Sequence, residues 1–225
     1  MPASRRCVLV FARPPRAEAR EKGLRSAEPL FRLAGRRLAA AVSALKGVDL
    51  LPVGGDSGPL EQRGEDFGER LRNAFADARA MGYETIVVVP GDVPGLGLPQ
   101  LQRAFDLLRD RAVVLGPSPD GGVYLLGVRG PSEHVLSGVR WQTGFVLHDL
   151  LARAGTAPLL PALGDLDCAS DLPRLLRAAA ADPALVAALR QIRADGASVG
   201  PSEEERVPTR PGLLRRAPRG PPATA

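Results

Sequence analysis

The chain has 225 residues, a length that favours a single domain. Hydrophobic residues make up 44% and charged residues 24%, which is ordinary for a globular protein and excludes a wholly disordered chain. Only 4% of the residues are aromatic, so the core must be built from Leu, Val and Ala. The two cysteines, Cys7 and Cys168, are too few for a disulfide framework.

The N-terminus carries no pattern typical of export. Arg5 and Arg6 are followed by only a short apolar run, which is too short for the apolar part of a signal peptide. No apolar run approaches the roughly 20 residues that span a bilayer. We therefore expect a cytoplasmic protein with no membrane partner.

Charge is distributed unevenly along the chain. Residues 1–46 carry 11 basic and 3 acidic side chains, whereas residues 47–195 carry 14 and 19. A basic first segment beside an acidic body suits a phosphate-bearing ligand that arrives with a metal ion. Only Lys22 and Lys46 are lysines, and the excess of arginine resembles a bias of composition, so nucleic-acid binding is not expected.

Strand-like and helix-like segments alternate from the N-terminus. Residues 8–11 form a continuous apolar run, typical of a strand buried on both faces. The next residues, to about residue 26, are polar and rich in arginine and predict a loop. Apolar residues at helical spacing then predict a helix over residues 27–46, and residues 48–52 predict a second strand.

The middle of the chain continues this alternation. Residues 66–81 follow helical spacing, and residues 85–89 are β-branched throughout, which predicts the strongest strand of the chain. A helix over residues 99–109 and strands over residues 113–115 and 123–128 follow.

The C-terminal third is predicted to be helical before its pattern ends. We expect helices over residues 144–154, with Thr143 as N-cap, and over residues 169–181 and 183–194. Beyond these, residues 196–225 are rich in Pro, Arg and Gly and predict a disordered tail. Residues 1–195 would form the domain.

Alternating strands and helices with apolar strands predict an α/β fold with a mainly parallel, doubly wound sheet. Ligands of such sheets bind beyond the carboxyl ends of the strands. Functional residues are therefore expected in the loops that follow them, which are residues 12–26, 90–97, 116–122 and 165–171.

Asp92 is the first candidate, because it follows the most apolar strand, between Gly91 and Gly95. A carboxylate at this edge suits Mg²⁺ or Mn²⁺ bound to a diphosphate. The alternative is that Asp92 closes a turn or caps the helix that begins near Pro99.

Three further carboxylates, of Asp165, Asp167 and Asp171, precede a predicted helix. One of them could complete a metal site with Asp92. The alternative, favoured by the local sequence alone, is that Asp167 or Ser170 caps the helix and Asp171 occupies its first turn.

A glycine-flanked helix start between residues 62 and 70 is the third candidate. Free N–H groups at such a start attract anions. The amide of Gln62 could read a base edge, and Arg70 could reach a phosphate, with Gly64 and Gly68 allowing close approach. The alternative is an ordinary amphipathic helix.

Asp120, Gly121 and Gly122 follow another strand. They either form a hairpin turn or bring backbone close to an acceptor, with Asp120 as a base. No Gly-rich dinucleotide fingerprint, Walker-A loop or serine nucleophile elbow is present, which disfavours NAD-linked redox, P-loop ATPase and serine-hydrolase chemistry.

Together these motifs resemble a family of bacterial GT-A glycosyltransferase-like proteins, of the selenodomain-associated or arsenosugar-biosynthesis transferase type. More distantly they resemble phospholactate guanylyltransferase and the molybdenum-cofactor nucleotidyltransferases. The order and spacing of the motifs agree over about residues 7–177. The matching stretches are residues 11–15, 62–70, 90–96, 116–122, 141–143 and 165–172.

The resemblance implies a GT-A fold, a three-layer α/β/α arrangement with a mixed central sheet. It implies that Asp92 and Asp167 bind the metal ion, Mg²⁺ or Mn²⁺. The nucleotide would lie against Ala12, Arg13 and the segment from Gln62 to Arg70. Asp120, Gly121 and Gly122 would lie near the acceptor, with Asp120 as the catalytic base.

One stretch departs from the family pattern. Family members usually have a glycine and then a Lys-Thr-Arg-Leu run after the segment that matches residues 11–15. Here Glu18 stands in place of the glycine, and Lys22 is one position out of register. Carboxylates are unfavourable in a diphosphate-binding loop, so this departure raises the possibility of a degenerate site.

Three functions follow as hypotheses. The first is metal-dependent glycosyl transfer from a nucleotide sugar to a small acceptor. The second is nucleotidyl transfer, in which a nucleoside triphosphate releases pyrophosphate; Arg13, Arg16, Arg20 and Arg25 suit a triphosphate. The third is a non-catalytic, degenerate GT-A module.

Overall fold

The computed structural model describes residues 5–54 and 59–197, and its centre is a five-stranded sheet. In spatial order the strands are β2, β1, β3, β5 and β4, and only β5 runs against the other four. The mainly parallel, mixed α/β sheet predicted from the sequence is confirmed. The strands are β1 (Arg5–Phe11), β2 (Val48–Val53), β3 (Tyr83–Pro90), β4 (Val113–Pro117) and β5 (Val123–Arg129).

The central strands are apolar on both sides because both faces of the sheet are covered. In β1, Cys7, Leu9 and Phe11 pack into one hydrophobic cluster, whereas Val8 packs into the cluster on the other face. The period of two places alternate side chains on opposite faces, so a continuous apolar run marks a strand covered on both.

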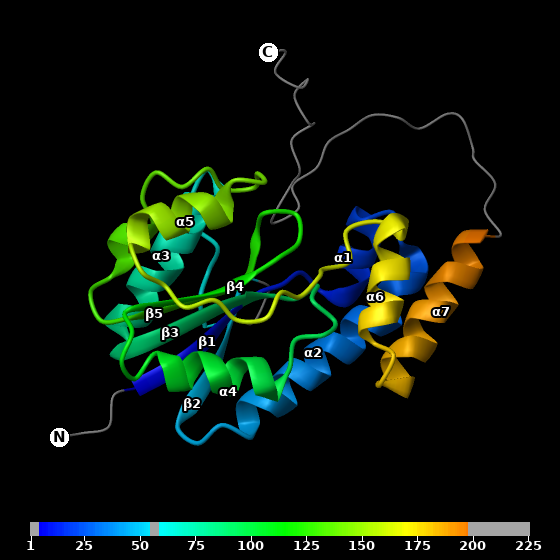
Figure 1. Cartoon of the computed structure of the whole chain (residues 1–225), viewed down its shortest axis with the longest axis horizontal. Coiled ribbons are helices and arrows are strands. Elements are labelled where there is room, and N and C mark those ends of the chain that lie inside the picture. The colour runs from blue at the N-terminus through cyan, green and yellow to red at the C-terminus, as the bar shows by residue number, and fades with distance from the viewer. Residues whose placement is uncertain (1–4, 55–58, 198–225) are drawn as a thin grey trace, which may run out of the picture.

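Helices form the outer two layers (Figure 1). Helices α3 and α5 pack on the face of Cys7 and Leu9, and α2 and α4 pack on the face of Val8. This is the three-layer α/β/α arrangement that the resemblance implies. The helices are α1 (Pro15–Glu21), α2 (Glu28–Ser43), α3 (Phe67–Ala80), α4 (Leu98–Leu107), α5 (Val146–Ala154), α6 (Leu172–Ala178) and α7 (Pro183–Ala197).

A separate small core joins the first and last helices. Leu30 of α2, Leu166, and Leu189 of α7 are buried in one cluster together with Ala19 of α1. Figure 1 shows α1, the start of α2, α6 and α7 gathered beside the sheet. This cluster fixes α1 next to the carboxyl ends of the strands.

The predicted loop over residues 12–26 is wrong, because it contains α1 and a 3₁₀ turn, Arg25–Ala27. Pro14 is the N-cap of α1, and Pro15 at its first position suits a helix start. Only Ala19 is buried in these seven residues, so no apolar periodicity reveals the helix.

Two other predicted boundaries also need correction. Phe145, not Thr143, is the N-cap of α5, although the Thr143 hydroxyl accepts a hydrogen bond from the Phe145 N–H. The helix predicted over residues 169–181 is a 3₁₀ turn (Ala169–Asp171) followed by the short α6.

The segment before α6 runs along the sheet and brings Asp167 to the end of β3. The Leu160 N–H donates to the carbonyl of Leu115 in β4, and the Leu163 N–H donates to the carbonyl of Pro117. The Leu166 N–H then donates to the carbonyl of Asp92, at 3.2 Å. Backbone hydrogen bonds therefore fix Asp167 beside Asp92.

In the part of the chain that the structure describes, no helix is long and apolar enough to cross a membrane. Residues 198–225, most of the predicted tail, lie outside the described residues.

Phe75 tests the packing of α3 on the sheet. Its side chain is fully buried, so we expect Phe75→Ala to lower the free energy of unfolding by about 3–5 kcal/mol. Met81→Ala is the control, because Met81 is 39% exposed and its loss should stay within about 0.5 kcal/mol. If urea denaturation showed that the two variants lose the same free energy of unfolding, this packing would be contradicted.

Candidate functional site

The carboxyl ends of β1 and β3 lie close together, at the end of the sheet where the site is expected. The Gly91 N–H donates to the carbonyl of Phe11 at 3.1 Å. A Cβ atom on Gly91 would lie 2.4 Å from the Cβ of Ala12, so only glycine fits there. Asp92 follows and is 9% exposed. Gly97 is the N-cap of α4, so Asp92 does not cap that helix.

Lys22 joins the two carboxylates that the sequence predicts as metal ligands. Its Nζ donates to Oδ2 of Asp92 at 2.6 Å and to Oδ1 of Asp167 at 2.7 Å. The Lys22 side chain is only 7% exposed. Burial lowers the pKa of Lys22, but Asp92 and Asp167 outweigh this effect and raise the pKa above its usual value. The ammonium group is therefore held charged between them.

Cys168, and not Asp167 or Ser170, is the N-cap of the 3₁₀ turn, so the predicted caps are wrong. Asp171 lies in that turn, as predicted. The Asp171 carboxylate accepts hydrogen bonds from the N–H groups of Asp167 and Cys168, both at 3.0 Å. The Asp167 carboxylate stays turned toward Lys22.

Asp120, Asp165 and Asp167 form a second group of carboxylates, with candidate ligand atoms within 4.8 Å of one another. Asp165 is 6% exposed. Burial, followed by the nearby Asp167, Asp92 and Asp120, raises the pKa of Asp165 to about 7. The sequence reasoning did not single out Asp165 as a ligand. The signal was its spacing of two from Asp167, which places both on one side of an extended segment.

Glu18 of α1 adds another acid to the site. Its carboxylate lies 3.5 Å from Nζ of Lys22 and 3.7 Å from Arg13. Burial and the Asp92 charge raise the pKa of Glu18, against the opposing effects of Lys22 and Arg13. The five carboxyl groups of the site outnumber its three cations, which are Lys22, Arg13 and Arg174, the last of these 3.8 Å from Asp165. The residues therefore fit a divalent cation, because hard oxygen donors surround a region short of positive charge.

A cavity of about 230 Å³ adjoins Asp92 between α1, α2 and the ends of β1 and β2. Its walls are largely apolar, with Ala12 and Arg13 among them, so two of the six predicted nucleotide-binding residues lie beside Asp92. The lining residues are Val10, Phe11, Ala12, Arg13, Pro15, Glu18, Phe31, Gly35, Leu38, Leu50, Pro52, Gly91 and Asp92.

The segment from Gln62 to Arg70 makes its polar contacts locally. The Gln62 amide donates to the carbonyl of Val53 at 3.1 Å, at the end of β2. Asp66 caps α3 by accepting from the Glu69 N–H. These contacts explain the local fold. Binding of a nucleotide by Gln62, Gly64, Gly68 and Arg70 remains a prediction.

The Asp120 turn joins β4 and β5 as a hairpin. Oδ1 of Asp120 accepts from the Gly122 N–H at 3.0 Å, and Gly121 has a φ of +88°. A Cβ on Gly121 would lie 2.1 Å from the carbonyl oxygen of Gly144, so glycine is required. The hairpin interpretation is confirmed, and the turn also brings Asp120 to the carboxylate group of the site.

Near the turns that flank β4 and α5, some buried polar groups lack a partner within the described residues. They are Oγ of Ser118 and Nε1 of Trp141. The next residue, Gln142, has a φ of 62°, which is rare for a residue with a side chain. Buried polar groups without a partner in the protein can be satisfied by an ordered water, an ion or a ligand.

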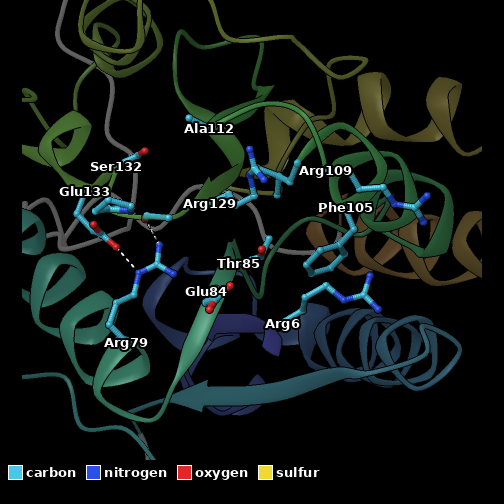
Figure 2. Close-up of a pocket in the computed structure, with 13 residues that line it drawn as sticks. Arg6, Arg79, Glu84, Thr85, Phe105, Arg109, Ala112, Arg129, Ser132 and Glu133 are labelled. Carbon is cyan, nitrogen blue, oxygen red and sulfur yellow. Dashed lines mark hydrogen bonds and ion pairs between the residues drawn. The ribbon is translucent and has the colours of Figure 1, made fainter. Parts of the chain in front are cut away.

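A larger cavity, of about 960 Å³, lies at the other end of the strands, where β1 and β3 begin (Figure 2). Thr85 and Arg129, which line it, pair with each other at the start of β3 and the end of β5. Arg79 there is already paired with Glu133. None of the residues predicted from the sequence lines this cavity.

Comparison with known proteins agrees with the fold. Residues 32–143 match the model of a family described as an uncharacterized protein conserved in bacteria (DUF2064). A structure from Desulfovibrio desulfuricans G20, assigned to the nucleotide-diphospho-sugar transferases, is 27% identical with a TM-score of 0.71. The match covers 85% of this chain and 98% of that chain. The resemblance to a bacterial GT-A-like family, and the nucleotide-diphospho-sugar transferase fold, are thus confirmed.

Other solved structures match with lower identities and lower TM-scores. Rv0371c from Mycobacterium tuberculosis H37Rv is 20% identical, with a TM-score of 0.41 over 78% of this chain and 99% of that chain. A 4-diphosphocytidyl-2C-methyl-D-erythritol synthase from Anaerococcus prevotii DSM 20548 is 10% identical, with a TM-score of 0.43 over 70% and 89%. No curated protein matches the chain.

Asp165 predicts a specific dependence of stability on pH. Its pKa of about 7 in the folded state stands against 3.8 when exposed. Between these values the folded state holds a proton that the unfolded state has lost, so stability falls as pH rises from about 4 to 7. Asp165→Asn removes this loss. We expect the free energy of unfolding of Asp165→Asn, relative to that of wild type, to increase across that pH range, by about 4 kcal/mol at most.

Urea denaturation at a series of pH values measures this difference. Asp106→Asn is the control, because Asp106 lies on the outer surface of α4, and its difference from wild type should show no such step. A pH-independent difference for Asp165→Asn would contradict the buried position of that carboxyl group.

Proposed function

We propose that the chain is a metal-dependent transferase that uses a nucleotide-activated sugar donor and a small acceptor. The observation that supports this most is the meeting of Asp92 and Asp167 on one cation, Nζ of Lys22. Two carboxylates from distant loops form a cation site at the edge of the sheet where α/β proteins bind ligands.

Asp92 and Asp167 would hold Mg²⁺ or Mn²⁺, with Asp120 and Asp165 nearby. When bound, the ion would neutralise the negative charge that develops on the leaving nucleotide. Arg13 lies on the wall of the cavity beside Asp92 and supplies a further positive charge for a diphosphate.

The nucleoside would occupy the apolar cavity between α1, α2 and the strand ends. This cavity opens beside Asp92, so a nucleoside there would place its diphosphate at the carboxylates. Phe31 is one of the residues on the cavity wall, and an aromatic side chain there suits a flat base.

Asp120 would act on the acceptor. Its Oδ1 is held by the Gly122 N–H, which fixes the carboxylate and leaves Oδ2 to take the proton of an acceptor hydroxyl. The backbone at Gly121 and Gly122 would let the acceptor approach closely.

Nucleotidyl transfer is the second candidate, because Arg13 adjoins the same cavity and suits a triphosphate. Release of pyrophosphate from a nucleoside triphosphate, with no turnover of nucleotide sugars, would favour this reaction. The third hypothesis, a degenerate module, is motivated by the altered loop, in which Glu18 replaces a glycine and Lys22 is one position out of register. Lys22 nevertheless reaches Asp92 and Asp167, which favours a working cation site.

Asp92→Asn tests the proposed site. Thermal unfolding of wild type should shift upward with a nucleotide or nucleotide sugar only when Mn²⁺ or Mg²⁺ is present, because a ligand stabilises the state that binds it. The variant should lose the metal-dependent part of the shift, since an amide is a poorer ligand than a carboxylate.

Asp110→Asn, at the exposed end of α4, is the control and should keep the full shift. An unchanged shift in Asp92→Asn would reject Asp92 as a ligand. No shift in wild type with any nucleotide would favour the degenerate module.

A further inference from the structure

The position between Asp92 and Asp167 already holds a positive charge. Nζ of Lys22 lies 2.6 and 2.7 Å from their oxygens, and its side chain is 93% buried. A magnesium ion held by the same oxygens would lie about 2.0–2.1 Å from each. An ammonium group and a divalent ion cannot both occupy this position.

We propose that Lys22 is a built-in cation that competes with the divalent ion for Asp92 and Asp167, and that it gives up this position to a metal–diphosphate complex. This inference rests on the proposed function for its diphosphate step only. The competition itself follows from the geometry of Lys22.

The anchoring of Lys22 explains why it would resist a metal ion alone. It follows the last turn of α1, and its backbone N–H donates to the carbonyl of Glu18. The Glu18 carboxylate, at 3.5 Å, also attracts the ammonium group. A metal ion arriving alone would therefore have to displace a buried cation that three carboxylates attract.

A diphosphate changes this balance. Its oxygens would offer the ammonium group a new partner, and the four-carbon stem of lysine lets the charge move without moving α1. The divalent ion could then take the two carboxylates. Metal and diphosphate would therefore each strengthen the binding of the other, by the same factor.

Titration of Mn²⁺ alone, followed by electron paramagnetic resonance, tests the competition in the full chain. Lys22→Met removes the competing charge at similar length. We expect it to bind Mn²⁺ more tightly than wild type, by about 5- to 150-fold. Lys46→Met is the matched control, because Lys46 is the other lysine and is exposed, and it should bind as wild type does.

Addition of UDP or GDP tests the coupling. Either nucleotide should raise the affinity of wild type for Mn²⁺ and should raise that of Lys22→Met much less. Suppose that Lys22→Met binds Mn²⁺ more tightly but UDP and GDP do not change the Mn²⁺ affinity of wild type. This result would support the competition between Lys22 and the metal ion and would reject the proposed function. Equal Mn²⁺ affinity in Lys22→Met and wild type, or no Mn²⁺ binding by either, would overturn the inference.

Amine acylation, read by mass spectrometry, tests the inference on wild type directly. It therefore replaces the Mn²⁺ titration if Lys22→Met does not fold. Without ligands, Lys46 should react and Lys22 should be protected. Millimolar Mn²⁺ with UDP or GDP should change the reactivity of Lys22 and leave that of Lys46 unchanged. Identical Lys22 labelling under all conditions would overturn the inference.

Discussion

A single ammonium group connects the chain segments that form the site. Nζ of Lys22 bonds two carboxylates that lie 70 and 145 residues further along the chain. Buried like charges repel strongly unless a cation lies between them, so Asp92 and Asp167 can share this edge only with a positive partner. The chain supplies that partner from its own first helix, which is why the position of α1 matters for the site.

The rest of the fold positions the three segments that carry Lys22, Asp92 and Asp167. The central strands end at one edge, and Gly91 lets the ends of β1 and β3 pack closely there. The segment before α6 is bonded to β4 and then to the carbonyl of Asp92, which sets Asp167 in place. The small core around Leu166 holds α1 against that segment. Even with Arg174 beside Asp165, the carboxyl groups of the site outnumber Lys22, Arg13 and Arg174, a condition that a divalent ion would relieve.

The sheet and the long helices could be predicted because their apolar periodicity is strong, as in residues 85–89 of β3. The short α1 could not, since one buried alanine leaves no periodic signal. Because α1 was not predicted, the position of Lys22 beside Asp92 was not predicted either, although its shift of one position from the family motif was noted. In a helix it lies one turn from Glu18 and points to Asp92. Asp92 was predicted as a ligand because it follows a strand at the ligand edge, whereas Asp167 was chosen among three nearby carboxylates only through the family resemblance. The structure brings the two side chains together on Lys22. The raised pKa of Asp165 depends on burial, which no local pattern reveals.

The most direct measurement is a crystal structure with Mn²⁺ and a nucleoside diphosphate, with the ion located by its anomalous scattering. The account predicts an Mn²⁺ peak bound by the carboxylates of Asp92 and Asp167, and Nζ of Lys22 moved from between them onto the diphosphate. An ion bound elsewhere, with Lys22 still bridging the two carboxylates, would contradict it.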